Sequence, residues 1–284
     1  MMSTFNSLPL ELKLSIFSNF SLKEKFQLRV VCKEWKLLLF DKSLLRHLDC
    51  SNTTGKGITD NALALVLSHA QRVDTLNVFN CFELTGSSII QAARDGKLKT
   101  LKSLCVSWSK LGDEVIVEIL KATKSMSALY LMECEISDQI ARHICMEASD
   151  TLWRLTLPGI RKWSNESISA VIENCPFLNS LDVTGNTLSQ PLLFAIFGGR
   201  KGSRLERLIL RCTSVDDEDV IQAMRILELS EKHSLAFLCV CQTSISEMVK
   251  RELERRAIRI CEGTEEEHGI TKSQKELLSI SASL

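Results

Sequence analysis

The chain has 284 residues, enough for one or two domains, and 45% of them are hydrophobic, which is ample for a packed core. Lys and Arg number 35, as do Asp and Glu, so the zero net charge argues against nucleic acid as the main partner, because phosphate binding depends on a basic excess. The sequence carries 11 cysteines, no signal-peptide pattern and no apolar run of membrane-spanning length, so we expect reduced thiols and a cytoplasmic or nuclear protein.

Residues 5–44 predict a small cluster of short helices. Its first apolar residues recur at helical spacing: Leu8, Leu12, Ile16 and Phe17. Pro9 suits the first helical turn, and Ser21 suits the N-cap of a second helix. Phe26, Val30 and Trp35 belong to further helical stretches. About forty residues make a marginal core alone, so this segment needs support from the rest of the chain or from a partner.

From residue 45 to residue 262 one phrase recurs at a period of about 25 to 30 residues: a large apolar residue, two variable ones, Leu, one variable residue, then Leu or Val. The central leucines of the seven clear copies and of one looser copy are Leu76, Leu104, Leu129, Leu155, Leu181, Leu208, Leu238 and Leu48. This pattern predicts an α/β leucine-rich repeat solenoid of about eight repeats, with a curved parallel sheet inside and helices outside. Ile258 and Ile260 predict a terminal edge strand, and residues 263–284 a capping or frayed tail.

Each strand is followed, three positions beyond its last apolar residue, by a small polar or sulfur residue. These residues are Cys81, Ser109, Cys134, Asn186, Thr213 and Thr243. We expect them to hydrogen-bond turn backbone that the coil leaves unpaired. An apolar residue two positions further on is predicted to pin each turn inward: Leu111, Ile136, Leu188, Val215 and Ile245.

Helix starts and irregular turns can also be predicted from local sequence. Ser164 suits an N-cap, and Ser244 lies three residues before Glu247, the spacing of a capping box. Pro158 and Gly159 depart from the repeat pattern, so we expect a bulge there.

The N-terminal segment resembles an F-box. Its matching phrases are Leu8-Pro9-Leu10-Glu11-Leu12, Ile16-Phe17 and Val31-Cys32-Lys33-Glu34-Trp35. An F-box followed directly by leucine-rich repeats resembles the F-box/leucine-rich-repeat family. The resemblance implies a substrate-recognition subunit of an SCF (Skp–cullin–F-box) ubiquitin ligase, in which the F-box docks the Skp-type adaptor and the repeats hold a target protein. It places these residues at or beneath the adaptor interface: Leu8, Pro9, Leu12, Ile16, Phe17, Val31 and Trp35. The motif often ends in tryptophan where this chain has Leu45, which weakens packing against the first repeat.

Strand residues that face away from the core line the concave face of a solenoid, where a target would bind. An aromatic and apolar group there is expected from Phe79, Tyr130 and Met132. Arg154, Arg207 and Arg211 supply donors for carboxylate or phosphate, and Asp182 lies among them. Seven or eight strands about 4.8 Å apart span roughly 35 Å, a length that suits a protein partner.

The sequence motifs for metal, phosphate, calcium or catalytic sites in this chain are weak. Cys239-x-Cys241 has no second Cys or His pair at ligand spacing, so no metal is predicted, nor any cofactor. Gly198 to Gly202 lacks the ending of a phosphate loop, and Asp216 to Asp219 suits a helix start better than a calcium loop. No nucleophile and base stand at recognisable spacing, so a non-catalytic adaptor is predicted. A scaffold or inhibitor that acts outside any ligase, or an enzyme with a hidden site, are the alternatives.

Overall fold

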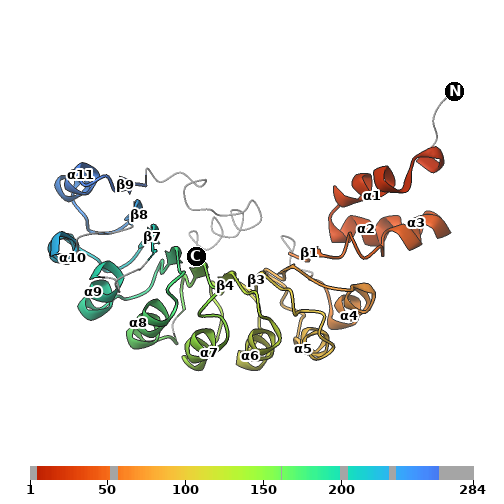
Figure 1. Cartoon of the computed structure of the whole chain (residues 1–284), viewed down its shortest axis with the longest axis horizontal. Helices are drawn as coiled ribbons and strands as arrows, with labels where there is room; N and C mark the ends of the chain where they lie inside the picture. Colours follow the sequence, from red (N-terminus) through yellow and green to blue (C-terminus); the bar gives the residue numbers. More distant parts are fainter. Residues whose placement is uncertain (1–4, 52–56, 161, 199–203, 230–234, 262–284) are drawn as a thin grey trace.

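The computed structural model describes residues 5–51, 57–160, 162–198, 204–229 and 235–261 (Figure 1). The N-terminal unit holds one 3-10 turn and three short helices, with the bounds η1 Phe5–Ser7, α1 Leu10–Ser18, α2 Leu22–Leu28 and α3 Lys33–Leu38. The N-cap of α2 is Ser21, as predicted, and Ser21 forms a reciprocal capping box with Glu24. This unit lies at one end of a long curved array of strands and helices.

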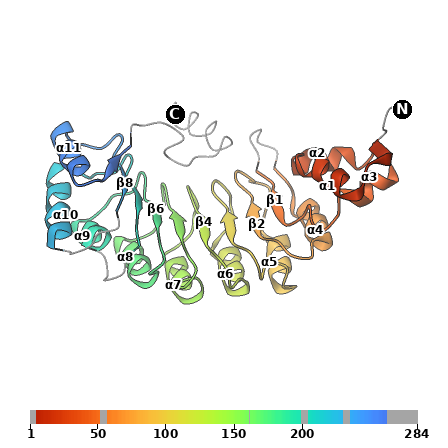
Figure 2. The same cartoon turned by 45° about the horizontal axis from the view of Figure 1, so that its top comes forward.

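The array is a parallel sheet of nine strands in sequential order. The strands are β1 His47–Asp49, β2 Thr75–Asn77, β3 Ser103–Cys105, β4 Ala128–Tyr130, β5 Arg154–Thr156, β6 Ser180–Asp182, β7 Arg207–Ile209, β8 Phe237–Cys239 and β9 Arg259–Ile260. The helices are α4 Asp60–His69, α5 Ser87–Arg94, α6 Asp113–Ala122, α7 Gln139–Glu147, α8 Asn165–Asn174, α9 Gln190–Gly198, α10 Asp217–Leu229 and α11 Glu247–Arg255. Strands line the inside of the arc and helices its outside (Figures 1 and 2), which confirms the predicted fold class.

The repeated leucines form a continuous ladder through the core. Leu48 pairs with Leu76, Leu76 with Leu104, and the same register continues to Ile260 in β9. Every residue of this ladder is buried, from Leu48 to Ile260. Because each repeat covers the apolar face of its neighbour, the core is shared along the array.

The residues predicted to satisfy the turns do so. Thr213 and Thr243 each donate a hydroxyl hydrogen bond of 2.6 Å to a carbonyl three residues back, and Ser109 does the same to Val106. Asn186 donates its amide to the carbonyl of Leu157 in the preceding repeat at 2.9 Å, and the Cys81 thiol reaches the Cys50 carbonyl at 3.1 Å. The apolar residues that follow are all buried, which confirms the predicted turns.

The carboxylates at the helix N-termini hold the next repeat in place. One oxygen of Asp60 accepts hydrogen bonds from Thr85 in the loop before α5, whose amide lies at 2.7 Å, and the other accepts from Ser88 in the first turn of α5, whose amide lies at 3.2 Å. Equivalent bonds to a serine amide one repeat further on are accepted by Asp113, Asp138, Asn165 and Asp217. Burial alone would raise the pKa of Asp60, but these hydrogen bonds lower it overall.

Two local predictions are wrong. Pro158 and Gly159 form no bulge, because the Gly159 amide donates to the Thr184 carbonyl at 3.0 Å in the register of the other repeats. The corresponding residue is in the left-handed region in each of the seven repeats from β2 to β8 (Asn80, Trp108, Glu133, Gly159, Gly185, Cys212 and Gln242). Helix α11 is capped by Ser246, which accepts the amide of Val249, and not by Ser244.

The N-terminal unit and the solenoid meet through aromatic side chains. Leu44 belongs to the small apolar cluster of the N-terminal helices, whereas Leu45 belongs to the core of the repeats. Phe40 stacks on His69 of α4 with ring centroids 4.3 Å apart, and Phe26 packs edge-on against Phe40 at 6.1 Å. A residue smaller than tryptophan at position 45 is therefore compensated by contacts from α2 and from Phe40.

Candidate protein-binding surfaces

The N-terminal unit is organised around a small aromatic core. Phe17 is 1% exposed, and its ring lies 5.2 Å from Trp35 and 5.4 Å from Phe5, measured between centroids. Lys13, on the same face of α1 as Phe17, forms a 2.6 Å ion pair with Glu34 of α3. Phe17 and Trp35 therefore hold the helices together from within the unit.

Other apolar residues of this unit face outward. Leu12 and Ile16, four positions apart on α1, are 52% and 39% exposed, and Val31 before α3 is 58% exposed. Three further residues are exposed although their burial would be expected from their type: Leu10, Val30 and Leu37. We call these six residues the N-terminal apolar surface. Of the predicted adaptor-binding residues, Pro9 is also exposed and Leu8 is half-buried.

The strands display two parallel rows of side chains along the concave face, from the first and third residues of each strand. The first row contains Arg154, Ser180 and Arg207 in register, and the second contains Tyr130, Thr156 and Asp182. The Arg154 guanidinium lies 3.4 Å from the Tyr130 hydroxyl, to which it donates, and 5.1 Å from the Trp153 ring. Among the described residues its Nε is buried and has no hydrogen-bond partner.

Asp182 lies in the row next to that of Arg154 and Arg207 and is itself partly buried. Burial raises its pKa, although hydrogen bonds from Thr184 and the charges of Arg207 and Arg211 oppose the shift. Arg207 stacks on the Phe237 ring at 4.0 Å, and the Arg211 Nε donates to the Gln242 side chain at 2.8 Å. The middle of the concave face is therefore a mixed surface of positive charge with one carboxyl group, next to Tyr130.

Two residues predicted for this surface are not available on it. Phe79 is 1% exposed and Met132 is 7% exposed, so the prediction that they offer an apolar contact to a partner is wrong in this structure. Both follow their strands in the turn where the chain leaves the sheet, and large apolar side chains there are buried. Tyr130 is half-buried, and so are the three arginines.

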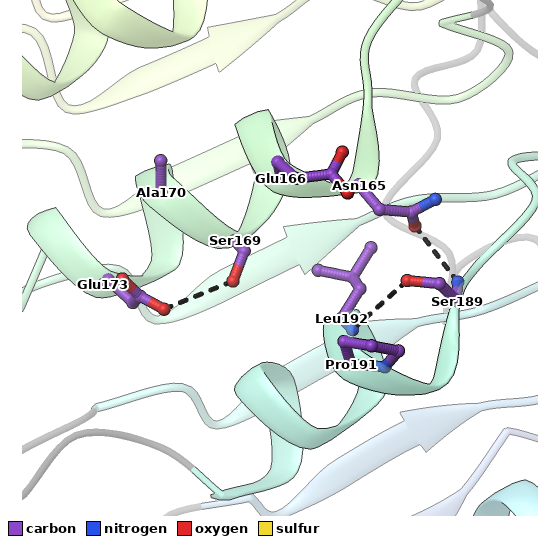
Figure 3. Close-up of a pocket in the computed structure, with 8 residues that line it drawn as sticks. All are labelled: Asn165, Glu166, Ser169, Ala170, Glu173, Ser189, Pro191 and Leu192. Carbon is purple, nitrogen blue, oxygen red and sulfur yellow. Dashed lines mark hydrogen bonds between the residues drawn. The ribbon is translucent and has the colours of Figure 1, made fainter.

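A pocket between α8 and α9 offers no catalytic constellation (Figure 3). Its polar groups bond to one another: the Ser189 amide donates to Asn165, and the Ser169 hydroxyl donates to Glu173 at 3.3 Å. The Leu192 amide donates to the Ser189 hydroxyl at 3.4 Å. These hydrogen bonds connect residues at the boundary between two neighbouring repeats.

Residues 5–51 match the family model described as F-box-like. The N-terminal unit is an F-box-like domain. No helix in the described ranges is long and apolar enough to cross a membrane.

Relatives share the arrangement of F-box and repeats. The chain is 24% identical over 262 residues to F-box/LRR-repeat protein 12 of Bos taurus, covering 80% of this chain and 78% of that protein. It is 25% identical over 258 residues to F-box/LRR-repeat protein 12 of Homo sapiens, with the same coverage. A chain of the crystal structure of the yeast Rad7 and Elc1 complex aligns with 86% of this chain and 79% of its own length, at 16% identity and a TM-score of 0.43. The curated relatives and the F-box match confirm the resemblance to F-box/leucine-rich-repeat proteins.

Proposed function

We propose that this chain is a substrate-recognition subunit of an SCF-type ubiquitin ligase. Its F-box binds a Skp-type adaptor and, through it, the cullin core, while the concave face binds a target protein. The mechanism is proximity: the target is held near the ubiquitin-conjugating enzyme at a high effective concentration, and the chain itself contributes no catalytic group. The F-box-like domain in direct continuity with the repeats is the observation that carries this proposal.

The N-terminal apolar surface supports the adaptor half of the proposal. Leu12, Ile16 and Val31 are exposed, whereas Phe17 and Trp35 lie beneath them in the small aromatic core. An exposed apolar group on a unit with so small a core is stabilised when a partner covers it. The residues to test are therefore the outward ones, because truncating Phe17 would unfold the unit and abolish binding for a trivial reason.

The adaptor interface can be tested with a Leu12→Ala/Ile16→Ala/Val31→Ala variant. We expect its affinity for a Skp-type adaptor to fall at least thirtyfold, which corresponds to about 2 kcal/mol, because apolar anchors dominate such interfaces. Its circular dichroism and unfolding midpoint should stay near those of the wild type. The matched control is Leu65→Ala/Met248→Ala, which truncates exposed residues of the solenoid helices. Full adaptor binding by the folded triple variant would refute the assignment.

The concave face can be tested with Arg154→Ala/Arg207→Ala. We expect targets captured by the wild type, with the ligase stalled, to be depleted while the adaptor and cullin are still recovered. Arg142→Ala/Arg225→Ala is the matched control, because both arginines are exposed on outer helices. Recovery of adaptor without cullin by the wild type would favour a scaffold or inhibitor that works outside a ligase. Unchanged target capture by the first variant would contradict the role of the concave face.

A further inference from the structure

Three cysteines converge at the C-terminal end of the concave face. The sulfur atoms of Cys239, Cys241 and Cys261 all lie within 4.8 Å of one another, and those of Cys241 and Cys261 are 3.4 Å apart. Cys239 is the last residue of β8, and Cys241 lies two positions further along the chain. Cys261 follows β9, whose residues pair with β8, and this pairing brings it beside Cys239. Sequence spacing alone did not reveal the group, since Cys261 is 20 residues beyond Cys241.

The spacing of these sulfur atoms fits one thiophilic metal ion. Zn²⁺ bound tetrahedrally at about 2.3 Å from each sulfur places the thiolates about 3.8 Å apart. One observed separation is 3.4 Å and the others are no longer than 4.8 Å, so small rotations of the side chains would complete the geometry. A disulfide would use only two of the three thiols and leave the third without a role.

The three thiols differ in how far they are exposed to solvent. Cys239 is fully buried and Cys261 is 8% exposed, with Ile209 and Phe237 packed against them, whereas Cys241 is partly open to solvent and gives a path of entry. The guanidinium groups of Arg207 and Arg259 lie 4.0 Å and 5.9 Å from the Phe237 ring. One Zn²⁺ and three thiolates carry a net charge of −1, which the positive charge of Arg207, close enough to interact with Cys239 and Cys261, offsets.

We propose that Cys239, Cys241 and Cys261 form a zinc site with three thiolate ligands and a fourth position open to water. Binding forms three Zn–S bonds and releases three protons to solvent, with no change of oxidation state. The proposal is independent of the function proposed above, because neither the F-box nor the arginines supply a ligand. Because binding releases protons, zinc affinity should fall as pH decreases.

The site can be tested on the full chain, reduced and stripped of metal. Titration with Zn²⁺ against a chromophoric chelator should give one site per chain, and Co²⁺ should give thiolate charge-transfer bands with the visible spectrum of tetrahedral coordination. Cys241→Ser and Cys261→Ser should each weaken binding more than about 100-fold, a larger loss than removal of an outer-shell group causes. The control is Cys32→Ser, which removes an exposed thiol in the F-box and keeps an oxygen to cap α3.

Three results would overturn the proposal. The first is binding no tighter than that of the Cys239→Ser/Cys241→Ser/Cys261→Ser variant. The second is equal affinity in wild type and Cys241→Ser. The third is a Cys241–Cys261 disulfide in freshly purified protein, detected as a mass lower by two hydrogens. Adaptor binding by the same preparations, measured in parallel, reports on the F-box separately.

Discussion

The F-box and the solenoid are both built from short helices or strands, yet they differ in how far their apolar residues are buried. In the solenoid the strand leucines are buried one above another, and each repeat is completed by the next. Among the described apolar residues of the F-box, only Phe17, Leu39 and Leu44 are buried, while Val30 and Val31 face outward at 81% and 58% exposure. The solenoid thus covers its own apolar surface, whereas the F-box leaves part of its apolar surface exposed.

The difference follows from how stability is shared. Helices α1 to α3 have nine, seven and six residues, too short to be stable alone, so they depend on a few central contacts. Each internal repeat of the solenoid packs against two neighbouring repeats, and both contribute to its stability. The N-terminal unit should therefore fail locally when its core is damaged.

The largest expected effect comes from Phe17→Ala, which removes the central ring of the F-box core. We expect a loss of about 3 to 5 kcal/mol in the stability of the N-terminal unit. Hydrogen exchange should show lost protection in α1 to α3, with that of α5 to α9 unchanged. Leu12→Ala, an exposed residue on the same helix, should alter stability by less than about 0.5 kcal/mol. Equal loss of protection throughout the solenoid would mean that the two regions unfold as one.

A smaller effect is expected from Asp74→Asn, at the start of the solenoid. Asp74 is 5% exposed, accepts two hydrogen bonds from Arg46, and accepts a third from Thr100 at 2.9 Å. Losing the charge should cost about 1.5 to 3 kcal/mol in the free energy of unfolding, measured by urea denaturation at neutral pH. Arg72→Ala serves as a control, because its 3.6 Å contact with Asp74 is looser and its side chain is half exposed.

The Asp74 contribution should depend on pH with a definite sign. Burial alone would raise its pKa, but Arg46 and Thr100 lower it overall. Stability from a lowered carboxyl pKa is present above the ordinary value of about 4 and is lost as pH falls below it. The difference between wild type and Asp74→Asn should therefore shrink in acid. Asp182, whose pKa is raised, should give the opposite sign, so Asp182→Asn should be least harmful at neutral pH. A pH-independent difference at Asp74 would exclude this account.

The smallest effect is expected from Gly185→Ala, in a turn of the solenoid. Gly185 has φ +70°, and the nearest atom that an added Cβ would meet is 3.9 Å away, so the cost is conformational and not steric. We expect a loss of about 1 to 2 kcal/mol, measured as a shift in the urea midpoint. Glu133→Gly at the equivalent exposed turn should change stability little, because relief of its left-handed backbone is offset by greater freedom in the unfolded chain. A stabilising Gly185→Ala would contradict this reading of the turns.

The sequence predicted those features that repeat or that depend on neighbouring residues. The leucine ladder, the turn residues such as Thr213 and the cap at Ser164 were foreseen because their partners lie at fixed local positions. Ser244 was mistaken for the cap of α11 because Ser246 is an equally good acceptor closer to the helix, and spacing alone does not distinguish them.

Features that depend on the packing of distant segments could not be predicted in this way. The burial of Phe79 is set by the turn that follows β2, although strand alternation places it on the concave side. The meeting of Cys261 with Cys239 depends on the register of the two-residue strand β9. Residues 263–284 and most of the Gly198 to Gly202 segment lie outside the described ranges, so the predictions for them are untested.

The arrangement of strands inside and helices outside also limits the shape of a protein that can bind the concave face. Neighbouring strands are about 4.8 Å apart, whereas neighbouring packed helices are about 8 to 10 Å apart. Each repeat is therefore narrower on the strand side than on the helix side, and the array curves toward the strands. A flat protein surface would contact only the two ends of the concave sheet. A convex or narrow protruding segment could contact several strands at once, so we expect the bound region of any target to be convex and narrow.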